Sequence, residues 1–349
     1  MSEPVIDCRQ LWKIFGAGEH RALEAARDRG AGKQDIFERF GCVIGVADVS
    51  FSVPAGEIFC VMGLSGSGKS TLVRHLNRLI EPTAGEVYIS GRDVNRLGPA
   101  ELRKLRSKEV GMVFQNMALL PHRTVIDNVA LSMELDGMPR KERHRLAAEK
   151  LELVELGGWD DRYPDELSGG MKQRVGLARA MAADPDILLM DEPFSALDPL
   201  IRRQLQNQFL ELAKVVRKTT VFITHDLDEA IRLGDRIAIM KDGRIVQIGT
   251  PEDIVTAPAD DYVADFVAGI SRLALVTAAK VMKPLETESA LTQQEIDAAP
   301  KVSPDDLLDE LVTIACETDR PIVVVDGAAA IGIITKRTLL QGIQGVNET

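Results

Sequence analysis

A glycine-rich loop between a short apolar strand and a helix most limits what this chain can fold into. Residues 63–71 read GLSGSGKST and fit the pattern GxxxxGK[ST]. The apolar run 58–62 predicts a buried parallel strand, and apolar residues at helical spacing in 72–80 predict a helix. Strand, loop and helix in this order form a phosphate-binding loop, in which glycines let backbone N–H groups point inward. The sequence therefore predicts an α/β nucleotide-binding core.

This loop supplies most of the residues expected to contact ATP. Lys69 would neutralise the β- and γ-phosphates, and the Ser70 hydroxyl would ligate Mg²⁺. A glycine-rich turn without nucleotide is the alternative, and the strand–loop–helix context disfavours it. The expected nucleotide contacts in the loop are Gly63, Leu64, Ser65, Gly66, Ser67, Gly68, Lys69, Ser70 and Thr71.

Two carboxylates follow a second apolar run, at residues 187–190. Open α/β sheets bind their ligands at the carboxyl ends of the strands, so Asp191 and Glu192 would face the nucleotide. Asp191 is expected to reach Mg²⁺ directly or through water. Glu192 is a candidate general base that orients and polarises the attacking water.

The pentapeptide Leu-Ser-Gly-Gly-Met at 167–171 lies between these two motifs. A Ser-Gly-Gly turn at a helix N-terminus presents backbone N–H groups to an anion, and the helix dipole favours that anion. Alone it could be an ordinary loop. With its neighbours it resembles the signature of ATP-binding-cassette (ABC) proteins, where the turn reaches a nucleotide held by a facing subunit. The resemblance implies nucleotide contacts from Ser168, Gly169 and Gly170 across a homodimer of ATPase subunits.

Three further positions follow the order that this family shows. Gln115, after an apolar strand, resembles the Q-loop residue that contacts the metal and the attacking water. His225 resembles the switch histidine that donates to the γ-phosphate, although a lone histidine is more often structural. Asp198 resembles the D-loop residue, in the segment that couples the two facing sites. The resemblance implies Glu192, His225 and Gln115 as catalytic residues, and Ser70, Gln115 and Asp191 as metal ligands.

The aromatic residue that stacks on adenine in this family has two candidates. Phe15 fits the flanking pattern of Lys-x before it and Gly after it. Phe40 fits the family's distance to the phosphate loop. Both could instead belong to the core, and the flanking pattern favours Phe15.

The motifs predict an ABC nucleotide-binding domain at 1–268. It would combine a RecA-like core with an antiparallel β-subdomain and with a helical subdomain at about 117–167. The segment 19–39, rich in Ala, Arg, Glu and Asp, predicts an inserted helical hairpin. A polar linker is expected at 269–300. Residues 301–349 resemble one cystathionine-β-synthase-type (CBS) motif, a small α+β segment that could pair between subunits or only aid dimerisation.

Composition limits the function classes. The net charge of −11 argues against nucleic acid, which usually requires a basic surface. No run approaches the ~20 apolar residues of a membrane helix, and the N-terminal residues lack signal-peptide character. The four cysteines are scattered without a CxxC pair, which excludes a zinc module. We therefore expect a cytosolic protein that meets a membrane only through partners.

Several segments outside the motifs resemble the ATPase subunits of quaternary-amine importers, which take up choline, glycine betaine or proline betaine. They include 11–16, 76–82 and the insertion. The resemblance implies integral membrane permease subunits, a periplasmic or extracellular substrate-binding protein, and a peripheral location on the cytoplasmic face of the bacterial inner membrane. The alternative is a non-transport ABC ATPase of DNA repair or translation. A stand-alone nucleotide sensor is a third, weaker interpretation. The residues do not decide between choline and glycine betaine, because this subunit would not touch the substrate.

Overall fold

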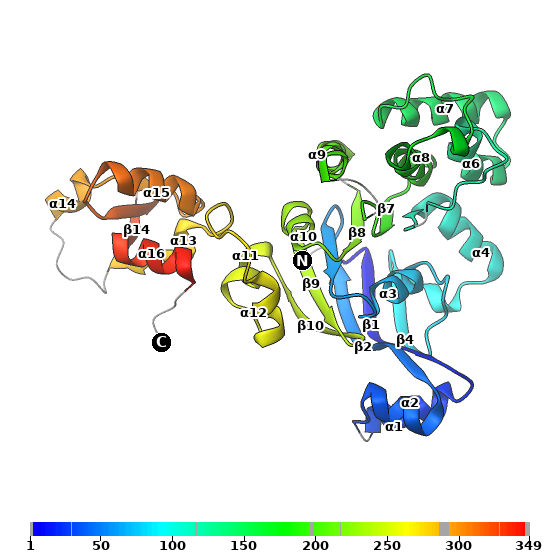
Figure 1. Ribbon diagram of the computed structural model, residues 1–349, viewed down its shortest axis with the longest axis horizontal. Coiled ribbons are helices and arrows are strands. Elements are labelled where there is room, and N and C mark those ends of the chain that lie inside the picture. Colours follow the sequence, from blue (N-terminus) through cyan, green and yellow to red (C-terminus); the bar gives the residue numbers. More distant parts are fainter. Residues whose placement is uncertain are drawn as a thin grey trace. The chain divides into compact units, whose positions relative to one another are not determined.

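The chain divides into two compact units, Met1–Thr250 and Pro251–Thr349. The structure is a computed structural model that describes residues 3–28, 30–115, 117–195, 199–216, 218–285, 293–327 and 329–345. Figure 1 shows the elements of each unit, coloured along the sequence. Among these described residues, no helix combines the length and apolar character that crossing a bilayer requires.

A six-stranded sheet forms the centre of the first unit. Its order is β10-β9-β3-β8-β7-β6, with only the edge strand β10 antiparallel to its neighbour. Every residue of β3, β7 and β8 is buried, as expected for parallel strands covered on both faces. The predicted buried strands before the phosphate loop and the acidic pair are confirmed. The bounds are β3 (Ile58–Met62), β6 (Val110–Val113), β7 (Ile187–Asp191), β8 (Thr219–Thr224), β9 (Arg236–Lys241) and β10 (Arg244–Gly249).

The predicted antiparallel sheet lies beside this core. Its order is β2-β1-β4-β5, and its inner residues share one apolar core with the six-stranded sheet and with helix α3 (Lys69–Leu76). Leu72, Val73 and Leu76 of α3 are buried in that core. The position of the phosphate loop is therefore set by both sheets. The bounds are β1 (Ile6–Phe15), β2 (Val43–Val53), β4 (Ala84–Ile89) and β5 (Arg92–Asp93).

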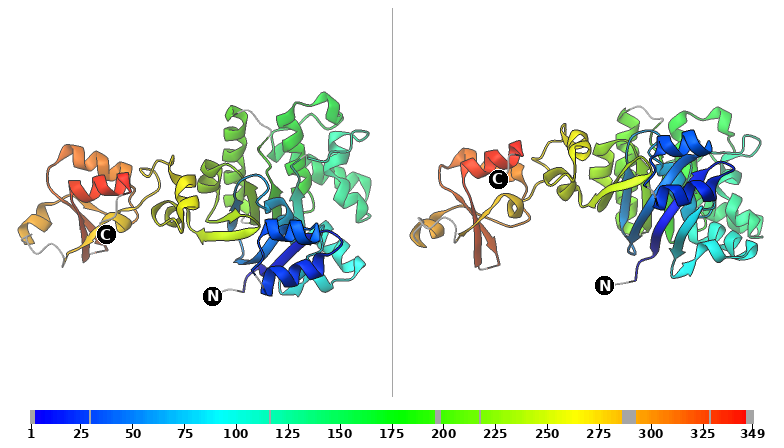
Figure 2. Two further views of the ribbon diagram at one scale, coloured as in Figure 1. Left: turned by 60° about the horizontal axis from the view of Figure 1, so that its bottom comes forward. Right: turned by 90° about the horizontal axis from the view of Figure 1, so that it is seen from below.

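The insertion is a helical hairpin, as predicted. Helices α1 (Glu19–Asp28) and α2 (Lys33–Phe40) pack on the antiparallel sheet through Leu23, Ile36 and Trp12. The hairpin is the dark blue pair of helices in Figure 2. Gly41, at φ 62°, ends α2 in the left-handed conformation that glycine adopts without strain.

Helices occupy the predicted region between β6 and β7, in and after residues 117–167. Helix α7 is the longest of those within the range, and α8 begins at the signature turn. Outside this region, helix α4 precedes β6, α9 follows β7 and α10 follows β8. The bounds are α4 (Pro99–Lys104), α5 (Val125–Val129), α6 (Leu131–Leu135), α7 (Arg140–Leu153), α8 (Gly169–Met181), α9 (Pro199–Val216) and α10 (Leu227–Leu233), with a π-helical turn at Leu105–Glu109 and 3₁₀ turns at Val94–Arg96 and Pro164–Glu166.

The second unit begins earlier than the predicted boundary at 268. Helices α11 (Pro251–Thr256) and α12 (Asp261–Val267) belong to it. The Glu252 carboxylate of α11 accepts two hydrogen bonds of 2.8 Å from Thr277, and the Arg272 guanidinium donates to the Val255 carbonyl at 2.8 Å. These bonds tie α11 to the chain that follows it.

The expected linker at 269–300 is also wrong in its described part. Val276 and Ala278 lie in the core of the second unit, and β11 pairs with β14. The sheet has the order β11-β14-β13-β12. Pairing with strands that are distant in sequence therefore orders this segment, although its polar composition predicts a linker. The bounds are α13 (Ala278–Val281), β11 (Lys283–Pro284), α14 (Gln293–Ala298), β12 (Lys301–Val302), α15 (Leu308–Glu317), β13 (Ile322–Asp326), β14 (Ala329–Ile334) and α16 (Lys336–Gln344).

Replacing Phe59 tests the shared core of the first unit. Phe59 is fully buried and its ring stacks on Phe51 at 5.0 Å between centroids. Phe59→Ala should lower the free energy of unfolding by about 3–5 kcal/mol. Phe37→Ala, which truncates an exposed phenylalanine of the insertion, should change it by no more than about 0.5 kcal/mol. Urea unfolding measures both, and equal losses would contradict the packing described.

Candidate active site

The phosphate loop is wedged between backbone segments that leave no room for side chains. Gly63 and Gly68 adopt φ values of 152° and 106°. A Cβ on Gly63 would overlap the carbonyl oxygen of Met240, and one on Gly68 would overlap that of Gly45. Glycine is required at both positions by conformation and by space.

The turn between β9 and β10 supports the loop from outside. The Gly243 N–H donates to the Ser67 carbonyl at 2.9 Å, and the Gly243 carbonyl accepts from the Ala47 N–H at 2.8 Å. Asp242 of the same turn pairs with Lys33 of the insertion at 3.2 Å. The Asp242–Gly243 pair is by itself a sequence signal for a hairpin turn only. The contact with the loop has no local sequence signal.

Lys69 and Ser70 open helix α3. The Lys69 ammonium donates to the carbonyl oxygens of Gly63 at 2.7 Å and Leu64 at 3.1 Å. Burial lowers the pKa of Lys69, and the nearby carboxylates of Glu192 and Asp191 oppose that shift. A buried cation held beside a glycine-rich loop can neutralise a phosphate.

Asp191 is fully buried at the end of β7 and is held by α3. The Ser70 hydroxyl donates to its Oδ1 at 2.7 Å, and the Arg74 guanidinium contacts its Oδ2 at 3.2 Å. A hydroxyl beside a carboxylate is a donor set that suits Mg²⁺, which uses few protein oxygens and shares the rest with phosphates and water. The described residues hold no cluster of three or more His, Cys, Asp or Glu that could bind a metal alone. Arg74 was not predicted, although it shares a helix face with Ser70 four residues earlier.

Two of the three predicted catalytic residues, Gln115 and His225, converge on the carboxylate of the third, Glu192. The Gln115 amide donates to Glu192 Oε2 at 3.3 Å, and His225 Nδ1 lies 3.2 Å from the same oxygen. Glu192 adopts the left-handed φ of 48°, and its N–H donates to the Ile223 carbonyl at 3.1 Å. The ends of three neighbouring strands, β6, β7 and β8, thus bring amide, carboxylate and imidazole together.

The two aromatic candidates lie in different surroundings. Phe15 is 40% exposed. A Cβ on Gly45 would lie 2.7 Å from that ring and 3.4 Å from the Thr71 methyl, so the ring is beside the start of α3. Phe40 instead packs on the apolar core of the insertion.

The first helix of the insertion also contacts the Phe15 side of the site. Lys13 Nζ lies 5.3 Å from the centroid of the Phe15 ring and 3.5 Å from Glu19 Oε2. The Thr83 hydroxyl donates to the same Glu19 oxygen at 3.1 Å. Glu19 therefore fixes the cation that lies against the exposed aromatic ring.

The signature turn is formed but is not joined to the phosphate loop. The Ser168 hydroxyl caps α8 by accepting from the Met171 N–H at 3.3 Å. A Cβ on Gly169 would meet nothing within 4 Å. No hydrogen bond between described residues links 168–170 to 63–71. Asp198 lies outside the described residues.

A phosphate loop, an acidic strand end and a capped Ser-Gly-Gly turn on this fold define an ATP-binding cassette. The ABC transporter family matches residues 46–195. The glycine betaine transport ATP-binding protein OpuAA of Bacillus subtilis is 51% identical over 298 residues, covering 85% of this chain and 70% of that protein. The trimethylamine N-oxide transport protein TmoW of Pelagibacter ubique is 44% identical over 326 residues, 93% of each chain. The chain belongs to the ATP-binding subunits of ABC transporters, within the quaternary-amine importer family.

The solved structures agree with this assignment. The cassette MJ0796, described as a dimer in a post-hydrolysis state bound to ADP and phosphate, superposes with a TM-score of 0.60 at 32% identity. The match covers 70% of this chain and 98% of that one. The protein is therefore an ATP-binding ATPase coupled to transmembrane transport.

Gly63→Ala tests the tight packing of the loop. The added methyl group would displace the loop from Met240, so ATP affinity should fall by at least about tenfold, or 1.4 kcal/mol. Gly91→Ala is the control, because its φ of 75° carries strain but its Cβ would meet nothing within 4 Å. Fluorescent-ATP titration measures both. Unchanged affinity in Gly63→Ala would contradict the wedged geometry.

Proposed function

We propose that this chain energises import of a quaternary amine, choline or glycine betaine, through separate membrane permease subunits. The convergence of Gln115 and His225 on Glu192, beside Lys69 and Asp191, carries the ATPase part of the proposal. The transport relatives favour an importer over a DNA-repair or translation ATPase.

Each residue of the site has a proposed role. Glu192 accepts a proton from, and orients, the attacking water, while His225 and Gln115 hold its carboxylate and the γ-phosphate end of the site. Lys69 and the N–H groups of the loop bind the phosphates. Mg²⁺ would be held by Ser70 and Asp191, with Gln115 at its edge, and would neutralise charge on the phosphates. Phe15 would stack on adenine.

The active unit is proposed to be a homodimer. The Ser168–Gly170 turn has its N–H groups at a helix start and an open Gly169, which suits a phosphate brought by a second copy. Asp198 would connect the two sites. The dimeric description of the similar cassette MJ0796 supports this arrangement.

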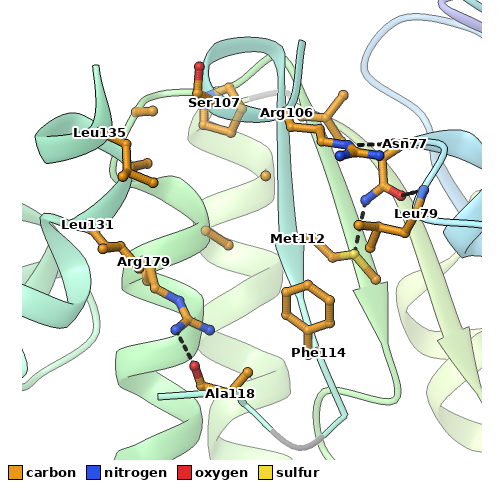
Figure 3. A pocket seen from close by; sticks show the side chains of 16 residues that line it. Asn77, Leu79, Arg106, Ser107, Met112, Phe114, Ala118, Leu131, Leu135 and Arg179 are labelled. Carbon is orange, nitrogen blue, oxygen red and sulfur yellow. Dashed lines mark hydrogen bonds between the residues drawn. The ribbon is translucent and has the colours of Figure 1, made fainter. Parts of the chain in front are cut away.

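A groove beside β6 is the proposed docking site for a permease segment. Its volume is about 360 Å³, and it lies between β6, α6 and α8 (Figure 3). Leu79 and Leu135 are exposed apolar side chains at its walls, and the half-buried Arg179 donates to the Ala118 carbonyl at 2.8 Å. Ala118, in the region 117–167 that the sequence assigns to the helical subdomain, lines this groove. An apolar helix from a permease fits such a surface.

The substrate class has two candidates. A quaternary amine, choline or glycine betaine, follows from the family. Trimethylamine N-oxide is a second candidate, because TmoW matches this chain over 93% of both lengths, whereas OpuAA matches over 70% of its own. Delivery by an extracytoplasmic binding protein, and a peripheral place on the cytoplasmic membrane face, complete the proposal. The segment 301–349 would act as a single CBS-like module.

Uptake of radiolabelled choline, glycine betaine and trimethylamine N-oxide tests the substrate class. Cells that lack this subunit should regain uptake of one of them with the parent chain. The Lys69→Ala chain should restore none. Failure of the parent to restore any of the three would overturn the substrate assignment.

Glu192→Gln tests the base. The amide keeps the size of the side chain but cannot take a proton, so ATP should still bind while turnover falls about 10²–10⁴-fold. Phosphate release and nucleotide binding are measured in parallel. The control is Glu149→Gln on an exposed face of α7, which should turn over like the parent. Near-parental turnover in Glu192→Gln would remove it from this role.

Phe15→Ala and Phe40→Ala separate the two aromatic candidates. Loss of a stacking face should weaken ATP binding by about 1–1.5 kcal/mol, roughly five- to tenfold, in Phe15→Ala only. Phe40→Ala should lower thermal stability and leave ATP affinity within about twofold. The reverse pattern of affinities would assign the adenine to Phe40.

A further inference from the structure

A buried hydrogen-bond network holds the residue before His225. Glu229, on α10, accepts from the Gln206 amide of α9 at 2.7 Å and from the Thr224 hydroxyl. Glu229, Gln206 and Thr224 are each at most 6% exposed. The carboxylate therefore bridges the end of strand β8 to helix α9.

The residue after His225 is held from the same helix. The Asp226 carboxylate accepts from Arg202 of α9 at 3.2 Å and from the Glu229 N–H at 3.2 Å. The Asp226 N–H donates to the Thr224 hydroxyl oxygen at 2.9 Å. Both neighbours of His225 are thus connected to α9, while the His225 side chain is 51% exposed and faces Glu192.

We propose that Glu229 is a positioning residue that links helix α9 to the switch histidine. Helix α9 begins at Pro199, directly after Asp198 in the sequence. A shift of α9 would move Thr224 through Gln206 and Glu229, and would move Asp226 through Arg202. The inference rests on the proposed role of His225 and adds the element that sets its position.

The chemistry of the network is directional. The Thr224 hydroxyl has one proton, which it donates to Glu229, so its oxygen is left to accept from Asp226. This arrangement fixes the Thr224 rotamer next to the histidine. Burial raises the pKa of Glu229, and the hydrogen bonds from Thr224 and Gln206 oppose that shift. A bridging carboxylate with two dedicated donors has little freedom to reorient.

Thr224→Val removes the bridge with little change in shape. In the 349-residue chain, kcat for ATP should fall by about tenfold or more, because small displacements of a catalytic group are costly. KM for ATP should stay within about twofold, because the phosphate loop is untouched. The matched control is Thr220→Val, in the same buried strand, whose hydroxyl donates to the Lys218 carbonyl at 3.4 Å and, among the described residues, makes no hydrogen bond to α9 or α10. It should keep the parent kcat.

A second pair of variants separates bridging from simple packing. Glu229→Gln can accept from Thr224 and donate to a turned Gln206 amide, so its kcat should stay within about threefold of the parent. The leucine of Glu229→Leu can neither accept nor donate, so kcat in this variant should fall as far as it does in Thr224→Val. Thermal unfolding identifies any variant that fails to fold. Equal kcat in Thr224→Val and Thr220→Val, or equal loss in Glu229→Gln and Glu229→Leu, overturns the inference. A parent chain without ATPase activity would instead count against the proposed function.

Discussion

The site depends on the pairing of the buried Asp191 carboxylate with Ser70 and Arg74. Burying a charge is costly unless it is paired and hydrogen-bonded, and here both partners come from α3. Because Ser70 and Arg74 must reach Asp191, helix α3 is held against the end of β7. The phosphate loop that starts this helix is fixed with it. The contacts that pair the buried charge of Asp191 therefore also set the position of the phosphate loop.

The sequence predicts those features of the fold that depend on residues close together in the chain. The phosphate loop, the acidic strand end, the helical insertion and the Asp242–Gly243 turn were predictable, because each depends on glycine, apolar periodicity or a turn pair. The start of the second unit at Pro251 and the ordering of Val276 depend on contacts between distant residues. Arg74 belongs to the same class, because its partner Asp191 is distant in sequence, and so does the contact of Glu229 with Gln206 of another helix. No periodicity marks such contacts.

One helix links the proposed docking groove beside β6 to the signature turn. Arg179, near the end of α8, donates to the carbonyls of Met117 and Ala118, whose backbones are left-handed at φ 49° and 47°. Gln115 lies just before them in the sequence, and α8 begins at the signature turn. A segment bound in the groove would therefore act on the Gln115 side and on the signature turn through the same rigid helix.

The insertion is not an appendage that could be exchanged at will. Lys33 reaches Asp242 of the turn that supports Ser67, and Glu19 holds Lys13 against Phe15. Consider a chimaera in which this cassette loses the hairpin, as in an importer that lacks it. Asp242 of the supporting turn would then lose Lys33, and Lys13 beside Phe15 would lose Glu19. When domains are exchanged between importers, the hairpin, β1 and the β9–β10 turn therefore have to be transferred together.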